Sequence, residues 1–302
     1  MRTLILGCLL ALTLAACGGK DASDGKKTIG VTLLSQSQDF YKDLEQGLRE
    51  EAERAGYRVI VQSGEFDPAI QARQLEDFVT KQVDAVVICP CDSDTVAASL
   101  RPVIKAGIPI FTADIAAKGV EVVTHVASDN MQGGTLAGET MAKLLGGKGE
   151  VLIIDHPTVS SVQDRTAGFL KALSAHPDMK VVGRPSSEGQ RAKAQSVMED
   201  ALTSYPNLAG VFGINDDSAL GALRAIEASG REGIVVIGYD ATPEAREAIQ
   251  RGSALKADVI QHPDDIGRKT ILAIEKHFAG ESLEKWVPVN VGIVDKAALD
   301  KR

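Results

Sequence analysis

The chain has 302 residues, a length that is typical of about two domains. It contains 41 Asp and Glu residues against 33 Lys and Arg residues, which gives a net charge of −8 at pH 7. An acidic chain without a basic stretch is unlike the proteins that bind nucleic acid, so we expect no nucleic-acid partner.

The first residues have the features of an export signal. Arg2 precedes a short apolar stretch over residues 3–16, which is too short to cross a bilayer comfortably. The segment Leu14-Ala15-Ala16-Cys17 resembles a bacterial lipobox, which implies cleavage after a signal of residues 1–16 and acylation of Cys17; the alternative is an ordinary signal peptide with an incidental cysteine. Residues 17–27 are expected to form a flexible tether. We therefore expect an exported protein, lipid-anchored to a bacterial membrane, facing the periplasm or the cell exterior and touching the membrane only through that anchor.

Two of the four cysteines, Cys89 and Cys91, remain once the signal and Cys17 are set aside. We interpret them as small buried thiols at a strand end, while a strained disulfide between them stays an alternative in an oxidising compartment. The five histidines show no ligand spacing such as His-x-x-x-His. We expect neither a metal nor a cofactor.

From Thr28 onward, short apolar runs alternate with amphipathic segments. Asp67 before Pro68 is a good helix N-cap followed by a first-turn proline. The predicted helices of the first half are 40–55, 68–81 and 94–106. The predicted strands are 28–34, 57–62, 85–89, 108–112, 151–154, 180–183, 210–214, 234–238 and 255–259, with helices between the later ones.

This alternation predicts parallel sheets wound by right-handed crossovers. About ten strands are many for one sheet, so two similar lobes are expected. The extended segment 122–128 precedes the second set of elements and is our candidate for the first crossing between the lobes.

Polar side chains and two aromatic residues recur where the predicted strands end. Ligands of open parallel sheets bind beyond the carboxyl ends of the strands, so these residues form a candidate site. Carboxylates accept hydrogen bonds from hydroxyl groups, amides both donate and accept, and an aromatic face packs on the C–H face of a sugar ring. The set therefore favours a neutral ligand with many hydroxyl groups. It consists of Gln38, Asp39, Phe40, Tyr41, Asp114, Asn215, Asp216, Asp217, Asp240 and Gln261.

Each of these residues also has a purely structural interpretation. Asp or Asn after a strand often caps the next helix, and we expect Asp216 to do so for a helix over 217–228. Phe40 and Tyr41 could belong to the core, although two adjacent aromatic residues at a helix start cannot both face the same core. The coincidence at five strand ends carries the prediction, not any single residue.

Three segments resemble bacterial ribose-binding proteins, which are the periplasmic binding proteins of sugar ABC importers. They are Val126-Ala127-Ser128-Asp129-Asn130, the stretch from Asn215 to Ala222, and Ile237-Gly238-Tyr239-Asp240-Ala241-Thr242-Pro243. The resemblance runs from about Thr28 to Val294. It implies an α/β protein of the type I periplasmic binding class, with two Rossmann-like lobes of parallel sheet flanked by helices and a three-segment hinge. The N-terminal lobe would comprise 28–128 with 262–290, and the C-terminal lobe 129–261 with 291–302.

The resemblance also implies roles for individual residues. Gln38, Phe40 and Tyr41 match the family's first-lobe loop that contacts the sugar, and Asp114 matches its ligand-binding aspartate. The second lobe and hinge would contribute Asn215, Asp240 and Gln261. Ile115 and Gln163 stand where ribose binders carry arginines, whereas Arg165 matches the family, and the aromatic residue expected near Glu188-Gly189 is absent. We therefore expect a monosaccharide, polyol or cyclitol other than ribose, because an arginine offers several fixed donors to sugar oxygens.

An enzyme is not expected. The chain has no Gly-x-Ser-x-Gly elbow, Walker loop or Gly-x-Gly-x-x-Gly, and Gly146-Gly147-Lys148-Gly149 follows a helix, as a C-cap and turn would. The resemblance implies a monomer that captures its ligand by lobe closure and delivers it to an ABC permease and ATPase complex. A ligand-presenting co-receptor for a chemotaxis or histidine-kinase sensor is the alternative.

Overall fold

The computed structural model describes residues 25–301. The expected signal and Cys17, the expected site of acylation, lie outside the described residues. Among the described helices, none combines the length and apolar character that crossing a bilayer requires.

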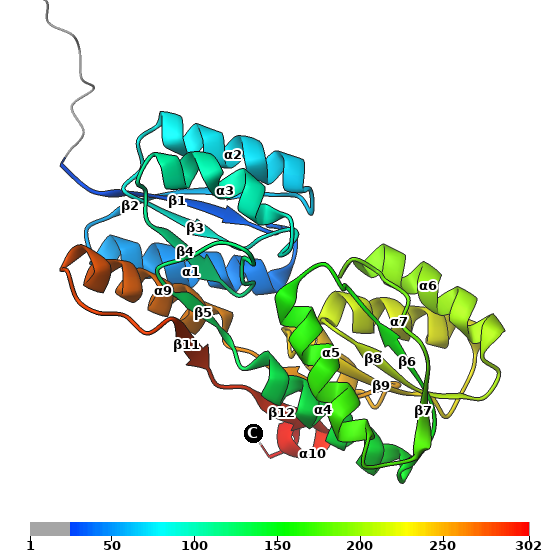
Figure 1. The fold of residues 1–302 in the computed structure, drawn as a ribbon. Coiled ribbons are helices and arrows are strands. Elements are labelled where there is room, and N and C mark those ends of the chain that lie inside the picture. Colours follow the sequence, from blue (N-terminus) through cyan, green and yellow to red (C-terminus); the bar gives the residue numbers. More distant parts are fainter. Residues whose placement is uncertain (1–24, 302) are drawn as a thin grey trace, which may run out of the picture.

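The first lobe contains a six-stranded parallel sheet in the order β11-β5-β4-β3-β1-β2. Two helices that pack on each other, α1 and α9, cover one face, and α2 and α3 cover the other (Figure 1). The strands are β1 (Thr28–Leu33), β2 (Arg58–Ser63), β3 (Ala85–Ile88), β4 (Ile110–Ala113), β5 (His125–Ser128) and β11 (Trp286–Val289). The helices are α1 (Asp39–Arg54), α2 (Pro68–Thr80), α3 (Val96–Lys105) and α9 (Pro263–Phe278).

The second lobe contains a six-stranded sheet in the order β12-β10-β9-β8-β6-β7, in which only β12 runs antiparallel to its neighbour. Helices α4 and α5 pack together on one face and α6 and α7 on the other (Figure 1). The strands are β6 (Lys148–Ile154), β7 (Asp178–Gly183), β8 (Leu208–Gly213), β9 (Val235–Asp240), β10 (Leu255–Ile260) and β12 (Gly292–Asp295). The helices are α4 (Asn130–Leu145), α5 (Ser160–Leu173), α6 (Arg191–Ser204), α7 (Asp216–Ser229), α8 (Pro243–Gln250) and α10 (Lys296–Leu299).

The chain passes between the two sheets three times: after β5, after β10 and between β11 and β12. The predicted class, two α/β lobes with a three-segment hinge, is confirmed. The expectation that residues 122–128 form the first crossing is wrong, because His125–Ser128 is a paired strand of the first sheet and the crossing follows it.

Two of the predicted helix ends are confirmed and one is corrected. Asp67 accepts from the backbone N–H of Ala69 at 2.7 Å and caps α2, with Pro68 in its first turn. Gly146 ends α4 in the left-handed region, at φ 63°, as a C-cap does. The predicted cap of α7 was wrong by one residue, because Asn215 accepts from the N–H of Ser218 at 2.9 Å while Asp216 is the first helical residue.

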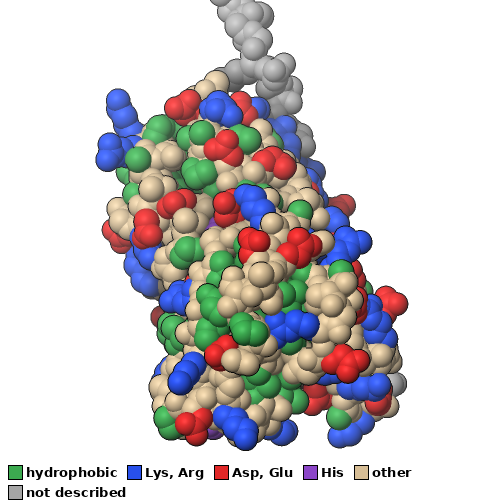
Figure 2. Space-filling model, turned by 90° about the vertical axis from the view of Figure 1, so that its right-hand side faces the viewer, with side chains coloured by type: hydrophobic (Ala, Val, Ile, Leu, Met, Phe, Trp, Pro, Cys, Tyr) green, Lys and Arg blue, Asp and Glu red, His purple; other side chains and the backbone are tan. Residues whose placement is uncertain are grey.

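Apolar side chains of α1, α9, α4 and α5 belong to one continuous buried cluster that reaches from the first lobe into the second. On the face shown in Figure 2, Lys and Arg side chains are interspersed with Asp and Glu side chains, so this face carries no large patch of one sign. The groups that meet in the interior between the lobes are described next.

Candidate ligand-binding site

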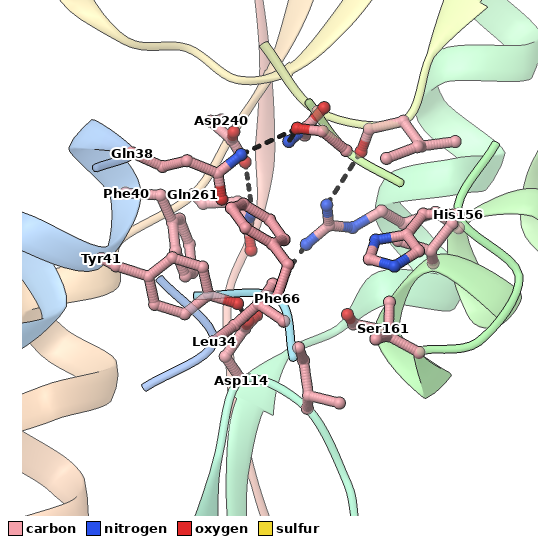
Figure 3. A pocket seen from close by; sticks show the side chains of 17 residues that line it. Leu34, Gln38, Phe40, Tyr41, Phe66, Asp114, His156, Ser161, Asp240 and Gln261 are labelled. Carbon is pink, nitrogen blue, oxygen red and sulfur yellow. Dashed lines mark hydrogen bonds and ion pairs between the residues drawn. The ribbon is translucent and has the colours of Figure 1, made fainter. Parts of the chain in front are cut away.

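A cavity lies between the lobes, at the carboxyl ends of their strands (Figure 3). It comprises about 380 Å³ of space between protein atoms, part of it open to solvent. Nine of the ten predicted ligand-binding residues line it: Gln38, Phe40, Tyr41, Asp114, Ile115, Arg165, Asn215, Asp240 and Gln261.

The two aromatic residues of the first lobe stand side by side at the start of α1. Phe40 and Tyr41 pack edge to face, with ring centroids 5.1 Å apart, and both are buried. The hydroxyl group of Tyr41 donates to Asp114 Oδ2 at 2.8 Å. The pair therefore supplies an apolar wall to the cavity and also orients a carboxylate.

Asp114 follows β4 in the left-handed region, with φ 61°, where Asp and Asn are tolerated better than most residues. Its carboxyl group is buried, and within the described chain no group donates a hydrogen bond to Oδ1. That oxygen lies 3.9 Å from Arg165 Nη2, beyond hydrogen-bond distance. Burial raises the pKa of Asp114, while the Arg165 guanidinium and the Tyr41 hydroxyl act in the opposite direction. A buried acceptor in this state costs free energy until a donor reaches it.

Arg165, on α5, is held from behind. Its Nε donates to Asn130 Oδ1 and its Nη1 to the carbonyl of Ile214, both at 2.8 Å. The guanidinium also lies over the ring of Tyr239, 4.0 Å from its centroid. Two of its three nitrogens are thus engaged, and Nη2 remains on the side of Asp114 and the cavity.

Asp240, at the end of β9 in the second lobe, is the third charged group at the cavity after Asp114 and Arg165. Asp240 accepts from Gln261 Nε2 at 2.7 Å and from the N–H of Asp216 at 3.2 Å. Burial, and next the negative charge of Asp216, raise the pKa of Asp240 well above its usual range. Within the described chain Gln261 Oε1 is buried without a donor. A second unmatched acceptor is thus present at the cavity.

The sequence profile of the periplasmic binding protein domain family matches residues 29–282. The chain belongs to this family. Over 297 residues it is 32% identical to the ribose import binding protein of Escherichia coli, with 98% of each chain covered.

Two solved structures of ABC transporter solute-binding proteins are similar to this one along nearly its whole length. An ABC transporter solute-binding protein from Mycobacterium smegmatis with bound glycerol has a TM-score of 0.87 at 31% identity, covering 92% of this chain and 96% of its own. One from Bacillus halodurans with bound myo-inositol has a TM-score of 0.84 at 28% identity, covering 93% and 98%. Periplasmic binding proteins are transport receptors and not enzymes, so the expected family and class are both confirmed.

Asp39, Asp216 and Asp217, which the strand-end pattern included in the candidate site, do not line this cavity. Among the residues that the resemblance implied, the one that this periplasmic binding protein does not bring to it is Gln163. It donates from Nε2 to the carbonyl of Pro157 at 2.7 Å, and its Oε1 accepts from Lys118 Nζ at 2.6 Å. Residues two apart on a helix point to different sides, so Gln163 cannot share the orientation of Arg165. Gln163 instead joins the lobes at the rim of the cleft.

Other side chains that line the cavity were not predicted. His156 follows β6 and could have been found by the strand-end rule, whereas Phe66 lies in the loop after β2 and carries no comparable signal. Burial lowers the pKa of His156, which favours its neutral form. The other unpredicted lining residues are Leu34, Val159, Ser161, Val162, Gly189 and Ile214.

The lobes also touch each other around the cavity. Gln38 Nε2 donates to the carbonyl of Gly189 at 2.8 Å and to Asp217 Oδ2 at 2.9 Å. Ser160 is joined to the first lobe through the N–H of Ala116 and through Ser93 Oγ, at 2.9 Å each. These contacts describe a state in which the lobes are closed on one another.

The cysteines lie behind the cavity. Cys89 and Cys91 are free and buried, so the disulfide alternative does not occur here. Burial raises the pKa of Cys91 to about 12 and that of Cys89 well above its usual range, which keeps both as thiols. Among residues 25–301, no group of three or more His, Cys, Asp or Glu side chains is arranged to hold a metal ion.

Proposed function

We propose that this protein captures a small neutral polyhydroxylated molecule, a monosaccharide, polyol or cyclitol, by closure of its lobes. The observation that carries the proposal is the pair of buried, unmatched acceptors, Asp114 Oδ1 and Gln261 Oε1, beside the fixed donor Arg165 Nη2. A hydroxyl group can donate to such acceptors and accept from such a donor at the same time. A ligand with several hydroxyl groups would satisfy all three.

The charge of the cavity supports a neutral ligand. Arg165 is the one Lys or Arg among the described residues that line it, and it already faces Asp114. A phosphate or carboxylate ligand would therefore meet Asp114 and Asp240 without a further cation to offset its charge. The rings of Phe40 and Phe66 offer apolar surface for the C–H groups of a ring-shaped or extended polyol.

We propose further that ribose is not the preferred ligand, because Ile115 is fully buried at the position where an arginine was expected. Ile115→Arg is expected to change the ranking of sugars, improving ribose relative to the preferred ligand by about tenfold, which corresponds to one added hydrogen bond to a charged group. Gln163→Arg is the matched control and should leave the ranking unchanged, since that side chain lies at the rim. Titration calorimetry with ribose and the preferred ligand measures both variants. Equal effects of the two changes would contradict the assignment of Ile115.

The ligand class is tested by thermal unfolding in a panel of pentoses, hexoses, polyols and inositols, with sugar phosphates and sugar acids as the charged comparison. A cognate ligand at 100 times its Kd stabilises the folded protein by about 2.7 kcal/mol, which is readily measured as a rise in Tm. We expect a neutral panel member to give the largest rise and ribose a small one. A larger rise with a sugar phosphate or acid would overturn the proposal.

Delivery to an ABC importer from the outer side of a bacterial membrane completes the proposed function. The similarity to an import binding protein supports the delivery step, and the segment Leu14-Ala15-Ala16-Cys17 supports a lipid anchor. Mass spectrometry of the membrane-extracted protein should find acyl groups on Cys17 and none after Cys17→Ser. An N-terminus at another residue would refute the anchor and leave the ligand proposal intact.

A further inference from the structure

Three carboxyl groups, two of them buried, meet behind the cavity in the second lobe. Asp258 in β10 and Asp216 at the start of α7 are 0% and 2% exposed, and Asp240 at the end of β9 faces the cavity. Asp258 does not line the cavity, and nothing in the proposed capture of a ligand uses it. Three like charges at adjacent strand ends would repel each other strongly in a poorly solvated interior.

In each of Asp258 and Asp216, only one of the two carboxyl oxygens accepts a hydrogen bond within the described chain. Asp258 Oδ1 accepts from the N–H of Ala241 at 3.0 Å, and Asp216 Oδ2 accepts from the N–H of Thr242 at 2.7 Å. The remaining oxygens, Asp258 Oδ2 and Asp216 Oδ1, are buried and receive no donor from any described residue. Two ionised carboxylates would leave both in that state, because neither can donate.

These two oxygens lie over the same glycine. A Cβ atom built on Gly238 would stand 2.9 Å from Asp216 Oδ1 and closer still to Asp258 Oδ2. The two carboxyl groups therefore face each other across one point, and only glycine leaves room for them there. A single proton between them would turn two unmatched acceptors into one hydrogen bond.

We propose that Asp258 and Asp216 share one proton at neutral pH and thereby act as positioning residues for Asp240. Between them they hold the N–H groups of Ala241 and Thr242, the two residues that follow Asp240. Asp240 and Ala241 have φ angles of 128° and 56°, so this turn is strained and depends on such contacts. That Asp240 then meets a ligand rests on the proposed function; the shared proton does not.

The charges around the pair agree with this assignment. Burial, and next the charge of Asp216 and a hydrogen bond to it, raise the pKa of Asp258 well above its usual range. Burial also raises the pKa of Asp216, which the hydrogen bond from Asp258 lowers again, so the proton belongs to Asp258. Asp240 from β9 and Asp217 from α7 add negative charge, and β12 places the apolar Val294 opposite Asp258.

On α8, Arg246 engages the same turn, since its Nε donates to the carbonyl of Ala241 at 2.7 Å. The Arg246 guanidinium therefore helps to hold the backbone of the turn at Ala241. Because the pKa of Asp258 is raised in the folded protein, its stabilising contribution is present at low pH and is lost as pH rises through that folded-state pKa. The turn at Asp240 and Ala241 should therefore become less ordered as pH rises through that pKa.

The decisive measurement uses the empty protein. Infrared spectra in D₂O at neutral pH should show the C=O band of a protonated carboxyl group, and Asp258→Asn should remove the intensity that the shared proton contributes to it. Asp155→Asn is the matched control, because Asp155 is equally buried but is paired with Arg184 at 2.7 Å, so the band should persist. A wild-type spectrum without the band, or a band whose intensity Asp258→Asn leaves unchanged, would overturn the proposal.

Positioning is read by NMR of the Ala241 and Thr242 amide groups and of the Asp240 carboxyl carbon across a titration from neutral to alkaline pH. In the wild type these shifts should move together. In Asp258→Asn the Thr242 amide shift should stay constant and any remaining movement should reflect ionisation of Asp240 alone, because the amide group of Asn can still accept from Ala241 and donate to Asp216. Asp258→Val can do neither, so the Asp240 signal should already be displaced at neutral pH; an unmoved signal would contradict positioning. Neither readout involves a ligand, so a failed ligand panel and a failed proton pair are separate outcomes.

Discussion

Asp114→Asn is expected to weaken binding of the cognate ligand by about tenfold to a hundredfold. The change replaces a carboxylate by an amide of the same shape, and hydrogen bonds to charged groups contribute about 1.5–3 kcal/mol. Asn also tolerates the left-handed backbone at this position, so the fold should not be strained. Titration calorimetry with the panel member that gives the largest rise in Tm measures the loss.

The stability of the empty Asp114→Asn protein should be unchanged or slightly higher. Burial raises the pKa of Asp114, so its ionised form costs free energy at neutral pH, and the amide removes that cost. Tyr41→Phe is the matched control, because it removes the donor to Oδ2 and leaves Oδ1 free for a ligand. A smaller loss of affinity is expected there. Unaltered affinity in Asp114→Asn would mean that this carboxylate serves only the fold.

Arg165→Met should cause the larger effect, a loss of affinity of at least about a hundredfold together with a lower Tm. The change removes the fixed donor of the cavity, and it leaves Asn130 Oδ1 and the Ile214 carbonyl without the guanidinium that satisfies them. Each unmatched buried group costs about 1–3 kcal/mol. Arg165→Lys keeps the charge but cannot reproduce the planar fork, so we expect an intermediate loss.

Arg231→Met separates the two effects of the Arg165 change. Arg231 lies in the same lobe and does not line the cavity, and its Nη1 donates to the carbonyls of Leu202 and Tyr205 at 3.0 and 3.1 Å. This variant should lower the Tm with little change in affinity. If Arg231→Met weakened binding as strongly as Arg165→Met does, general loss of stability and not the cavity donor would explain both.

Strand–helix alternation predicted the architecture because each apolar run is short, buried and followed by an amphipathic segment. The edge strands β11 and β12 escaped prediction, since neither is the fully buried apolar run that β3 and β4 are, and Pro288 interrupts the apolar pattern of β11. Proline is tolerated at a sheet edge, where an N–H group can remain unpaired, so the pattern of a buried strand does not apply there.

The strand-end rule located most of the candidate site, since parallel strands bring their carboxyl ends to one edge. It says nothing of side chains inside a helix, so Gln163 and Arg165 entered the prediction only through the resemblance to ribose-binding proteins. The match of aligned positions did not show that α5 directs Gln163 to the rim and Arg165 to the cavity. The hydrogen bond from Arg165 to Asn130 could not be predicted from the sequence either. That contact joins the neighbouring helices α4 and α5 and depends on packing between segments that no local pattern connects.

The strand order has a consequence for assembly of the chain during synthesis and export. Each sheet takes five of its strands from one continuous stretch, from Thr28 to Ser128 in the first lobe and from Lys148 to Ile260 in the second. The first sheet lacks its edge strand until Trp286–Val289 is available to pair with His125–Ser128. In the same lobe, α1 lacks its packing partner until α9 has been made. Contacts of such long sequence separation form slowly, because loop-closure entropy must be overcome before they contribute. The second sheet likewise lacks its edge strand until Gly292–Asp295 can pair with β10, so a chain still lacking its last residues can complete neither lobe. The first lobe is the less complete of the two, because α1 also lacks its packing partner α9.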